Sequence, residues 1–134
     1  MMVLALLVGL AGGLGAASRF LVDDNVTRWL ARTGRTGSGV SLPWATVAIN
    51  VSGSLLLGLL TGLAAGHLLD ADLVAVAGTG FCGGYTTFST ATVETLRLAL
   101  RRETPLAVVN ALGTTAAALA AAGLGWWVGA ALGP

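Results

Sequence analysis

The stretch GFCGGYTTFST, residues 80–90, interrupts a long run of uncharged residues. It holds three glycines, four serine or threonine residues and three aromatic residues in eleven positions, whereas the surrounding chain is mainly Leu, Ala and Val. The adjacent Gly83 and Gly84 each weaken a helix by about 1 kcal/mol relative to Ala. The β-branched and aromatic residues that follow add little helix preference. The stretch therefore predicts a local break in an apolar helix.

The composition indicates that this helix lies in a membrane. Of the 134 residues, 55% are hydrophobic and 10% are charged, and the mean hydropathy is +0.85. Soluble domains carry about 25% charged residues. A membrane-spanning helix takes about 20 apolar residues, so four spans with short loops use nearly the whole chain. We therefore predict an all-α integral membrane protein with a single four-helix domain, its third helix broken at mid-membrane. The predicted helices cover about residues 2–22, 43–66, 72–100 (with the break near 83–88) and 105–132.

The composition also argues against several other classes of protein. A net charge of +1 is no signature of nucleic-acid binding. Cys82 and His67 are the only residues of their types, so the chain can form no internal disulfide and offers too few ligands for a zinc site. The sequence contains no paired carboxylates in an apolar setting and no Ser/His/Asp set. The glycine-rich GLAGGLG at 9–15 lacks the preceding strand of a dinucleotide fingerprint. We therefore expect neither an enzyme nor a nucleic-acid partner.

Small residues lie on one face of three predicted helices, and two interpretations of the polar ones remain open. Small faces are typical of close helix packing in membranes. An amide deep in hydrocarbon is costly without partners and often marks a pathway, which favours a functional role for Asn50. The stretch 80–90 is either a tight helix crossing or a site whose freed carbonyls hold a cation. There the positive edge of Phe88 could also face an anion. The small faces comprise Gly9, Gly12, Gly13, Ala16 and Ala17; Asn50, Gly53, Ser54, Gly58, Thr61 and Gly62; and Asn110, Gly113, Thr114, Ala117, Ala118 and Ala121.

Three segments resemble, in order, the signature segments of the CrcB/Fluc fluoride channel family. They are GGLGAASRF (12–20), NVSGSLLLG (50–58) and GFCGGYTTFST (80–90), of which the third is the most specific. The resemblance covers nearly the whole chain. It implies a small antiparallel dimer with two pores, each passing fluoride passively, excluding chloride and lowering fluoride in the cytoplasm. It also implies a structural sodium ion at the dimer centre.

The resemblance assigns expected roles to individual residues. The backbone carbonyls of Gly83 and Thr86 match the sodium ligands, and Arg19 matches an arginine near a pore mouth. Asn50 and Phe88 match the pore asparagine and the first pore phenylalanine. Since fluoride is small and strongly hydrated, a pore must offer hydrogen-bond donors in place of water. The further donors that we expect along the fluoride pore are Thr87, Ser89, Asn110, Thr114 and Thr115.

Two positions in the third segment depart from the family pattern. Ala91 stands where the family usually has a second phenylalanine, so the aromatic pair is incomplete in this chain. Tyr85 stands where leucine is more usual.

The distribution of positive charge predicts one orientation in the membrane. All seven basic side chains are arginines at or near the first and third predicted loops. The positive-inside rule then places these loops in the cytoplasm and both termini outside a bacterial plasma membrane. An antiparallel homodimer needs both orientations of one chain. We therefore hypothesise that this subunit joins either itself or, as the charge bias favours, a homologous subunit of opposite orientation. The arginines are Arg19, Arg28, Arg32, Arg35, Arg97, Arg101 and Arg102.

Two alternatives to a fluoride channel remain. A small multidrug-type antiparallel transporter would need a membrane-embedded carboxylate, but the first helix has none and the acidic residues lie in or next to predicted loops. A non-transporting membrane scaffold would explain the small faces but not GGYTTFST.

Overall fold

The computed structural model describes residues 1–34 and 41–133. Residues 35–40, in the predicted first loop with Arg35, and residue 134 lie outside the described part. Within the described part the protein is built from helices, without strands. Three segments there are long and apolar enough to cross a membrane: Met2–Arg32, Trp44–Ala65 and Thr104–Ala131. These features fit an all-α membrane protein.

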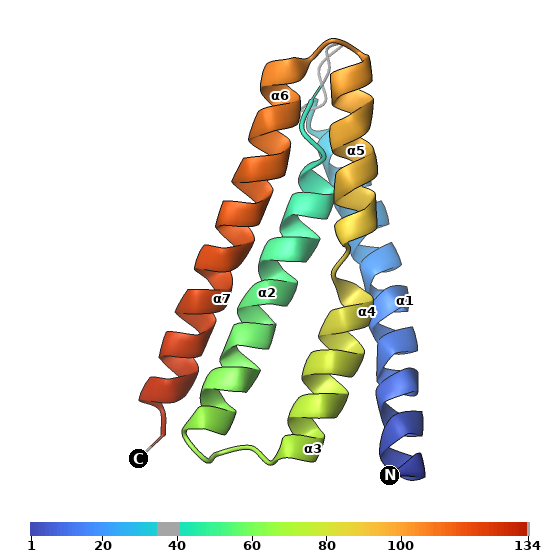
Figure 1. Cartoon of the computed structure of the whole chain (residues 1–134). Coiled ribbons are helices and arrows are strands. Elements are labelled where there is room, and N and C mark those ends of the chain that lie inside the picture. Colours follow the sequence, from blue (N-terminus) through green and yellow to red (C-terminus); the bar gives the residue numbers. More distant parts are fainter. Residues whose placement is uncertain (35–40, 134) are drawn as a thin grey trace.

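The chain forms four successive runs between the two ends of the molecule, and each run is antiparallel to the one before it (Figure 1). The first two runs are single helices, α1 (Met2–Arg32) and α2 (Trp44–Ala65). Both termini lie at the end where α2 meets the third run (Figure 1). The third run comprises α3 (Ala71–Val74), the π-helix η1 (Ala75–Cys82), α4 (Gly83–Tyr85) and α5 (Phe88–Leu100). The fourth comprises α6 (Thr104–Val108), the π-helix η2 (Val109–Gly113) and α7 (Thr114–Ala131).

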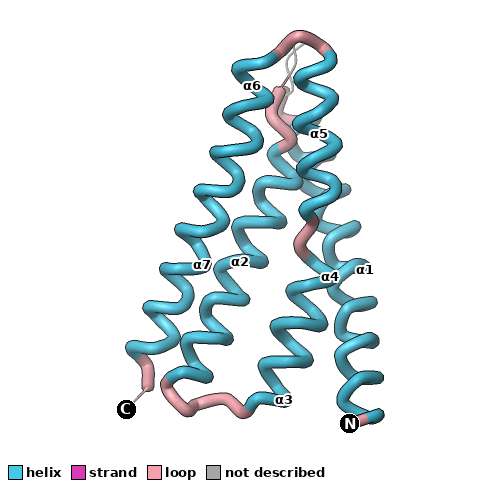
Figure 2. The backbone as a smooth tube through the Cα atoms, viewed as in Figure 1, coloured by secondary structure: helices cyan, strands magenta, loops and turns pink. Residues whose placement is uncertain are grey.

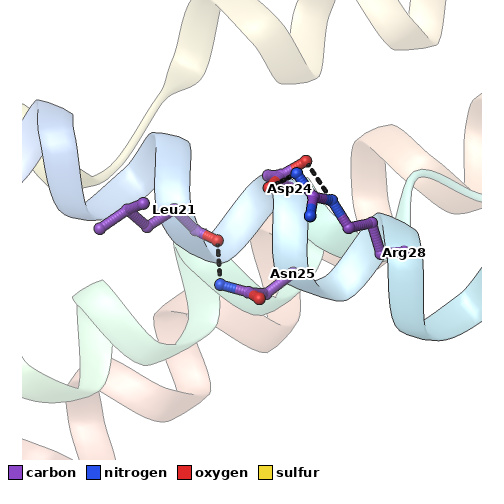
Figure 3. A network of polar contacts seen from close by, with 4 residues as sticks. All are labelled: Leu21, Asp24, Asn25 and Arg28. Atoms are coloured by element: carbon purple, nitrogen blue, oxygen red, sulfur yellow. Dashed lines mark hydrogen bonds and ion pairs between the residues drawn. The ribbon is translucent and has the colours of Figure 1, made fainter.

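Helix α1 is longer than predicted, because its polar end is hydrogen-bonded along the helix. The expected end at Val22 is wrong, since helical structure continues to Arg32. Asn25 donates from Nδ2 to the Leu21 carbonyl at 2.7 Å (Figure 3). One turn on, Arg28 forms a two-pronged ion pair with Asp24, with N–O distances of 2.9 and 2.7 Å (Figure 3). Pairs at i and i+4 support a helix locally, so polar composition alone did not mark its end.

The third run is interrupted about halfway along its length (Figure 2). Helical structure ends at Tyr85 and begins again at Phe88. Between them Thr86 has ψ 160° and Thr87 has φ −148° and ψ 118°, which are extended conformations. The interruption covers two residues and is narrower than the predicted 83–88, because Gly83–Tyr85 still form a helical turn.

Glycines set the closest helix contacts. A side chain at Gly58 would overlap the backbone of Ala122, and one at Gly125 would overlap the Leu55 carbonyl, so α2 and α7 touch backbone to backbone. On the other side of the molecule, a side chain at Gly84 would overlap the backbone of Gly12 in α1. Such contacts are typical of helices packed within membranes. They draw the interrupted run against α1 and leave α2 between the third and fourth runs.

The outer surface of the protein is apolar. The side chains buried in the described part are few and mostly small, and Ile49 and Leu98 are the largest apolar ones among them. Large apolar side chains such as Leu6, Leu14 and Leu119 are more than 60% exposed. In water this surface would be a liability, whereas in a bilayer it contacts lipid chains.

Candidate functional site

The Asn50 amide holds the interruption of the third run against α2. Its Nδ2 donates to the Thr87 carbonyl at 2.9 Å, and its Oδ1 accepts from the Thr87 N–H at 2.8 Å. The costly amide predicted from the sequence therefore finds the backbone N–H and C=O of Thr87, at the break, as its partners. One of the two Nδ2 hydrogens is used in this pair, so the second is not consumed by it.

Thr87 begins α5 as its N-cap. Its Oγ1 accepts from the Thr90 N–H at 3.2 Å and donates to the Thr90 Oγ1 at 2.9 Å. The Ser89 hydroxyl lies 3.3 Å from the same Oγ1. Thr87 is 7% exposed, so this hydroxyl cluster begins in the interior and reaches the surface at Ser89. A Thr at the N-cap satisfies one of the free N–H groups of the first turn.

A second polar cluster surrounds Asn110 on η2. Its Nδ2 donates to the Thr95 Oγ1 at 2.8 Å and lies 3.5 Å from the Ala91 carbonyl. The Thr114 hydroxyl lies 3.5 Å from the Asn110 Oδ1. Asn110 is only 2% exposed, and it joins the fourth run to α5. A buried amide with several partners is the arrangement that buried polar groups require.

One face of α5 carries both clusters. Thr87, Ala91 and Thr95 are spaced four residues apart, which puts them in one row along the helix. Thr87 belongs to the Asn50 cluster and Thr95 to the Asn110 cluster. The structure therefore brings four predicted pore residues to this row: Asn50, Thr87, Asn110 and Thr114. Ser89 contacts Thr87 from outside the row. Ala91 lies between the two clusters.

The other predicted residues do not join these clusters. Phe88 is 85% exposed, so its ring projects from the surface of the chain. It stacks on no other aromatic ring among the described residues. Thr115 is exposed and donates to the Ala111 carbonyl of its own helix. Arg19 is half-buried on α1 and forms no ion pair with another residue in the described part.

The carbonyls of Gly83 and Thr86 have lost their usual helical donors. In an α-helix the N–H of residue i donates to the carbonyl of residue i−4. The Thr87 N–H, which would serve Gly83, donates to Asn50 instead. The Thr90 N–H, which would serve Thr86, donates to the Thr87 hydroxyl. Space is open above Gly83, where an added Cβ would meet nothing within 4 Å. The carbonyls of Gly83 and Thr86 are thus left without these helical donors.

The sequence reasoning missed the contacts of Tyr85 and Thr95. Tyr85 stacks on Phe81 with ring centroids 5.9 Å apart, and its hydroxyl lies 3.1 Å from the Ser52 Oγ. Its replacement of a more usual leucine therefore adds a polar contact with α2. Thr95 could have been predicted from its position eight residues after Thr87, because residues at i, i+4 and i+8 lie on one face of a helix.

Glu94 departs from the expectation that acidic residues lie in or next to loops. It is half-buried within α5, six residues before that helix ends. Its side chain forms a hydrogen bond with Thr46 of α2. Its Oε2 is buried without a hydrogen-bond partner in the described part of the chain. A carboxylate in an apolar run was the signal that could have identified it.

Elsewhere the protein offers an open apolar groove. The groove has a volume of 660 Å³ and is lined by Val26, Trp29, Leu30, Trp44 and Ala48, so none of the predicted pore residues lines it. No group of three or more His, Cys, Asp or Glu side chains is placed to hold a metal ion in residues 1–34 and 41–133.

Comparison with known proteins identifies the family. The family model described as CrcB-like protein, Camphor Resistance (CrcB), matches residues 6–126. The chain is 48% identical over 124 residues to "Fluoride-specific ion channel FluC 1" of Leifsonia xyli, covering 92% of this chain and 85% of the relative. It is 46% identical over 121 residues to "Fluoride-specific ion channel FluC 2" of Mycobacterium bovis, covering 90% and 86%. A third relative, "Fluoride-specific ion channel FluC 2" of Cutibacterium acnes, is 45% identical over 91% of this chain and 94% of its own length. The chain is therefore a multi-pass membrane protein that belongs to the CrcB family.

Proposed function

We propose that this chain is a subunit of a fluoride-selective passive channel that lowers the fluoride concentration of the cytoplasm. The relatives are named for this activity, and the match covers most of their length and of this chain. This supports the same activity here. The observation that carries the proposal is the row of neutral polar side chains along α5. It begins at the Asn50 amide bound to Thr87 and continues to Asn110 and Thr114. No enzymatic step is involved.

The chemistry of the row suits a small, strongly hydrated anion. Fluoride can leave water only where hydrogen-bond donors replace its hydration shell. The second Nδ2 hydrogen of Asn50 and the Ser89 hydroxyl are such donors. None of them carries a full positive charge, so the ion is attracted without being held tightly. The edge of the Phe88 ring, which is partially positive, adds a weak anion contact. Arg19 on α1 supplies positive potential from a distance.

A second subunit completes the pore in this proposal. Phe88, Ser89 and Thr115 lie on the surface of one chain, and a pore wall in a bilayer cannot remain open to lipid on one side. In an antiparallel dimer each subunit would cover this surface of the other, and the two covered surfaces would form two pores. The exposed Phe88 would then meet an aromatic residue of the other subunit, which could supply the ring that is missing at Ala91.

The charge bias favours a homologous partner over a second copy of this chain. The described arginines, except Arg19, lie in the last turns of α1 and α5 or directly after them, at the end opposite both termini (Figure 1). With this end in the cytoplasm, both termini are outside. The third run then also crosses the membrane, in addition to the three apolar spans, and its interruption lies at mid-membrane. The partner would carry the opposite bias. A homodimer is the alternative. Ion efflux from liposomes that contain this chain alone tests it.

A sodium ion fits the two released carbonyls. Hard cations prefer oxygen ligands, and carbonyls at a broken helix are used to hold them inside membranes. Gly83 and Thr86 provide two such oxygens per subunit, and an antiparallel dimer would provide four around its axis. The ion would fix the two subunits together and raise the positive potential beside the pore.

The other two classes explain less of the structure. A multidrug-type transporter needs a carboxylate exposed to substrate, and α1 has none between Met2 and Val22. Glu94 is instead bonded to Thr46 within the protein. A scaffold accounts for the glycine contacts of α2 and α7 but gives no reason for the Asn50 and Asn110 clusters.

Growth in fluoride tests the proposal in cells. Expression of this chain, alone or with a homologous partner, should restore growth of a bacterial strain that lacks fluoride exporters. Asn50→Leu should abolish the rescue because it removes the pore amide. Ala91→Phe should improve rescue by the chain alone if the missing ring limits conduction. A failure of the unsubstituted chain in both settings, with the protein present in the membrane, would contradict the proposal.

A further inference from the structure

Two side chains of this protein redirect the backbone N–H groups that would otherwise close the third run into a continuous helix. Asn50 takes the Thr87 N–H at 2.8 Å, and the Thr87 hydroxyl takes the Thr90 N–H at 3.2 Å. These N–H groups are the α-helical donors for the carbonyls of Gly83 and Thr86. The two carbonyls released in this way are the two assigned to sodium in the proposed function.

We infer that Asn50 and Thr87 are positioning residues for the cation site, and that Asn50 couples this site to the pore. The inference rests on the proposed function, because it concerns the cation proposed there. Asn50 acts through its two ends. Its Oδ1 holds the Thr87 N–H away from Gly83, while the free hydrogen on its Nδ2 is available to an anion. One amide thus keeps the helix open for the cation and offers a donor to fluoride.

Ordinary explanations exist for each contact taken singly. Threonine is a common N-cap, and an asparagine between membrane helices often bonds a neighbouring backbone. The N-cap bond uses the N–H three positions after the cap, which is the Thr90 N–H, four positions after Thr86. Capping therefore explains the free Thr86 carbonyl but not the free Gly83 carbonyl. A cap alone also does not account for the first redirection, because the Thr87 N–H is taken from outside the helix by α2.

The Thr90 redirection can be tested with a matched pair of variants at the N-cap. Thr87→Val keeps the shape of the side chain but removes the hydroxyl, so the Thr90 N–H is free to return to the Thr86 carbonyl. Thr87→Ser keeps the hydroxyl and serves as the control. The measurement is the thermal unfolding midpoint of the purified protein in detergent, as sodium replaces N-methyl-D-glucamine at constant ionic strength. A ligand that binds only the folded protein raises this midpoint with its concentration.

A second pair addresses Asn50. Asn50→Leu removes both ends of the amide, whereas Asn50→Asp retains an acceptor for the Thr87 N–H and loses the donor. We expect the unsubstituted protein, Thr87→Ser and Asn50→Asp to be stabilised by sodium. In Thr87→Val and Asn50→Leu the sodium concentration needed should rise about tenfold or more, since one carbonyl ligand is taken up by the helix in each. Asn50→Asp should retain the sodium effect and lose fluoride efflux, which a merely structural role would not predict.

The outcomes separate this inference from the proposed function. If Thr87→Val and Asn50→Leu, eluting as the unsubstituted protein does in gel filtration, respond normally to sodium, the inference is wrong and the cation site stands. If the unsubstituted protein shows no response to sodium, the cation site and the inference both fail, whereas its fluoride efflux still decides the channel. The two pairs are independent, so either decides the inference if a variant of the other does not fold.

Discussion

At the scale of single residues, two asparagines organise the polar interior in different ways. Asn50 bonds the backbone N–H and C=O of Thr87 at the interruption of the third run, and Asn110 bonds the Thr95 side chain of α5. The importance of Asn50 could be predicted from the cost of an amide in hydrocarbon. Its partner could not, because which peptide group faces α2 depends on the position of the break. Thr115 was predicted as a pore donor beside Thr114. It is exposed, because it is one residue further along the helix and faces another direction, and its hydroxyl donates to the Ala111 carbonyl of the same run.

The Asn110 cluster predicts a measurable loss of stability. Asn110→Leu should lower the free energy of unfolding by about 1–3 kcal/mol, because Thr95 and Thr114 lose a partner in a buried site. Thr115→Val should change it by less than about 0.5 kcal/mol, as for other exposed substitutions. Denaturant unfolding in detergent measures both. Equal losses for the two variants would mean that the Asn110 contacts do not hold the fourth run to α5.

At the scale of secondary-structure elements, glycine spacing determines how closely the helices approach. The small face of α2 was predictable from its periodicity, and the structure brings its Gly58 against Ala122. The contact of Gly125 with Leu55 was not predicted, because Gly125 lies beyond the small face expected between Asn110 and Ala121. The length of α1 was not predictable either, because hydrogen bonds at i and i+4 compensate for its polar residues. The π-helices η1 and η2 have no sequence signature comparable to a cap or a turn, and they lie beside the break and the Asn110 cluster.

Two glycines of α7 provide opposite predictions. Gly125→Ala should destabilise the protein by about 1–3 kcal/mol, because its methyl group overlaps the Leu55 carbonyl of α2. Gly123→Ala, on the same helix with nothing within 4 Å, should be neutral or stabilising by up to about 1 kcal/mol. Thermal unfolding of the two variants compares them directly. A destabilised Gly123→Ala with an unaffected Gly125→Ala would contradict the backbone contact of α2 and α7.

At the scale of the whole molecule, charge and exposure are distributed unevenly. The end with Arg28, Arg32 and Arg101 is basic, whereas the end with both termini has no Lys or Arg. The exposed apolar surface could be predicted from composition alone. The surface position of Phe88 could not, because it depends on how α5 turns after the break. Both features lead to the proposal of a dimer with a partner of opposite charge bias.

The charge distribution predicts a single topology in the membrane. Single cysteines at Ser41 and Leu68, which are exposed at opposite ends of α2, can be introduced with Cys82 replaced by alanine. A membrane-impermeant thiol reagent added to intact cells should label Leu68→Cys and not Ser41→Cys. Both sites should react after the cells are opened. Equal labelling of the two sites from outside would indicate dual insertion and remove the argument for a partner of opposite orientation.

The central claim is tested most directly by ion efflux from liposomes that contain the purified chain, alone and together with a homologous subunit of opposite charge bias. A fluoride electrode and a chloride electrode follow the two ions from matched preparations. The account predicts rapid fluoride efflux with little chloride efflux when the pair is present, and the same result with this chain alone would mean a working homodimer. Absence of fluoride efflux in both preparations, or chloride efflux as fast as that of fluoride, would contradict the account.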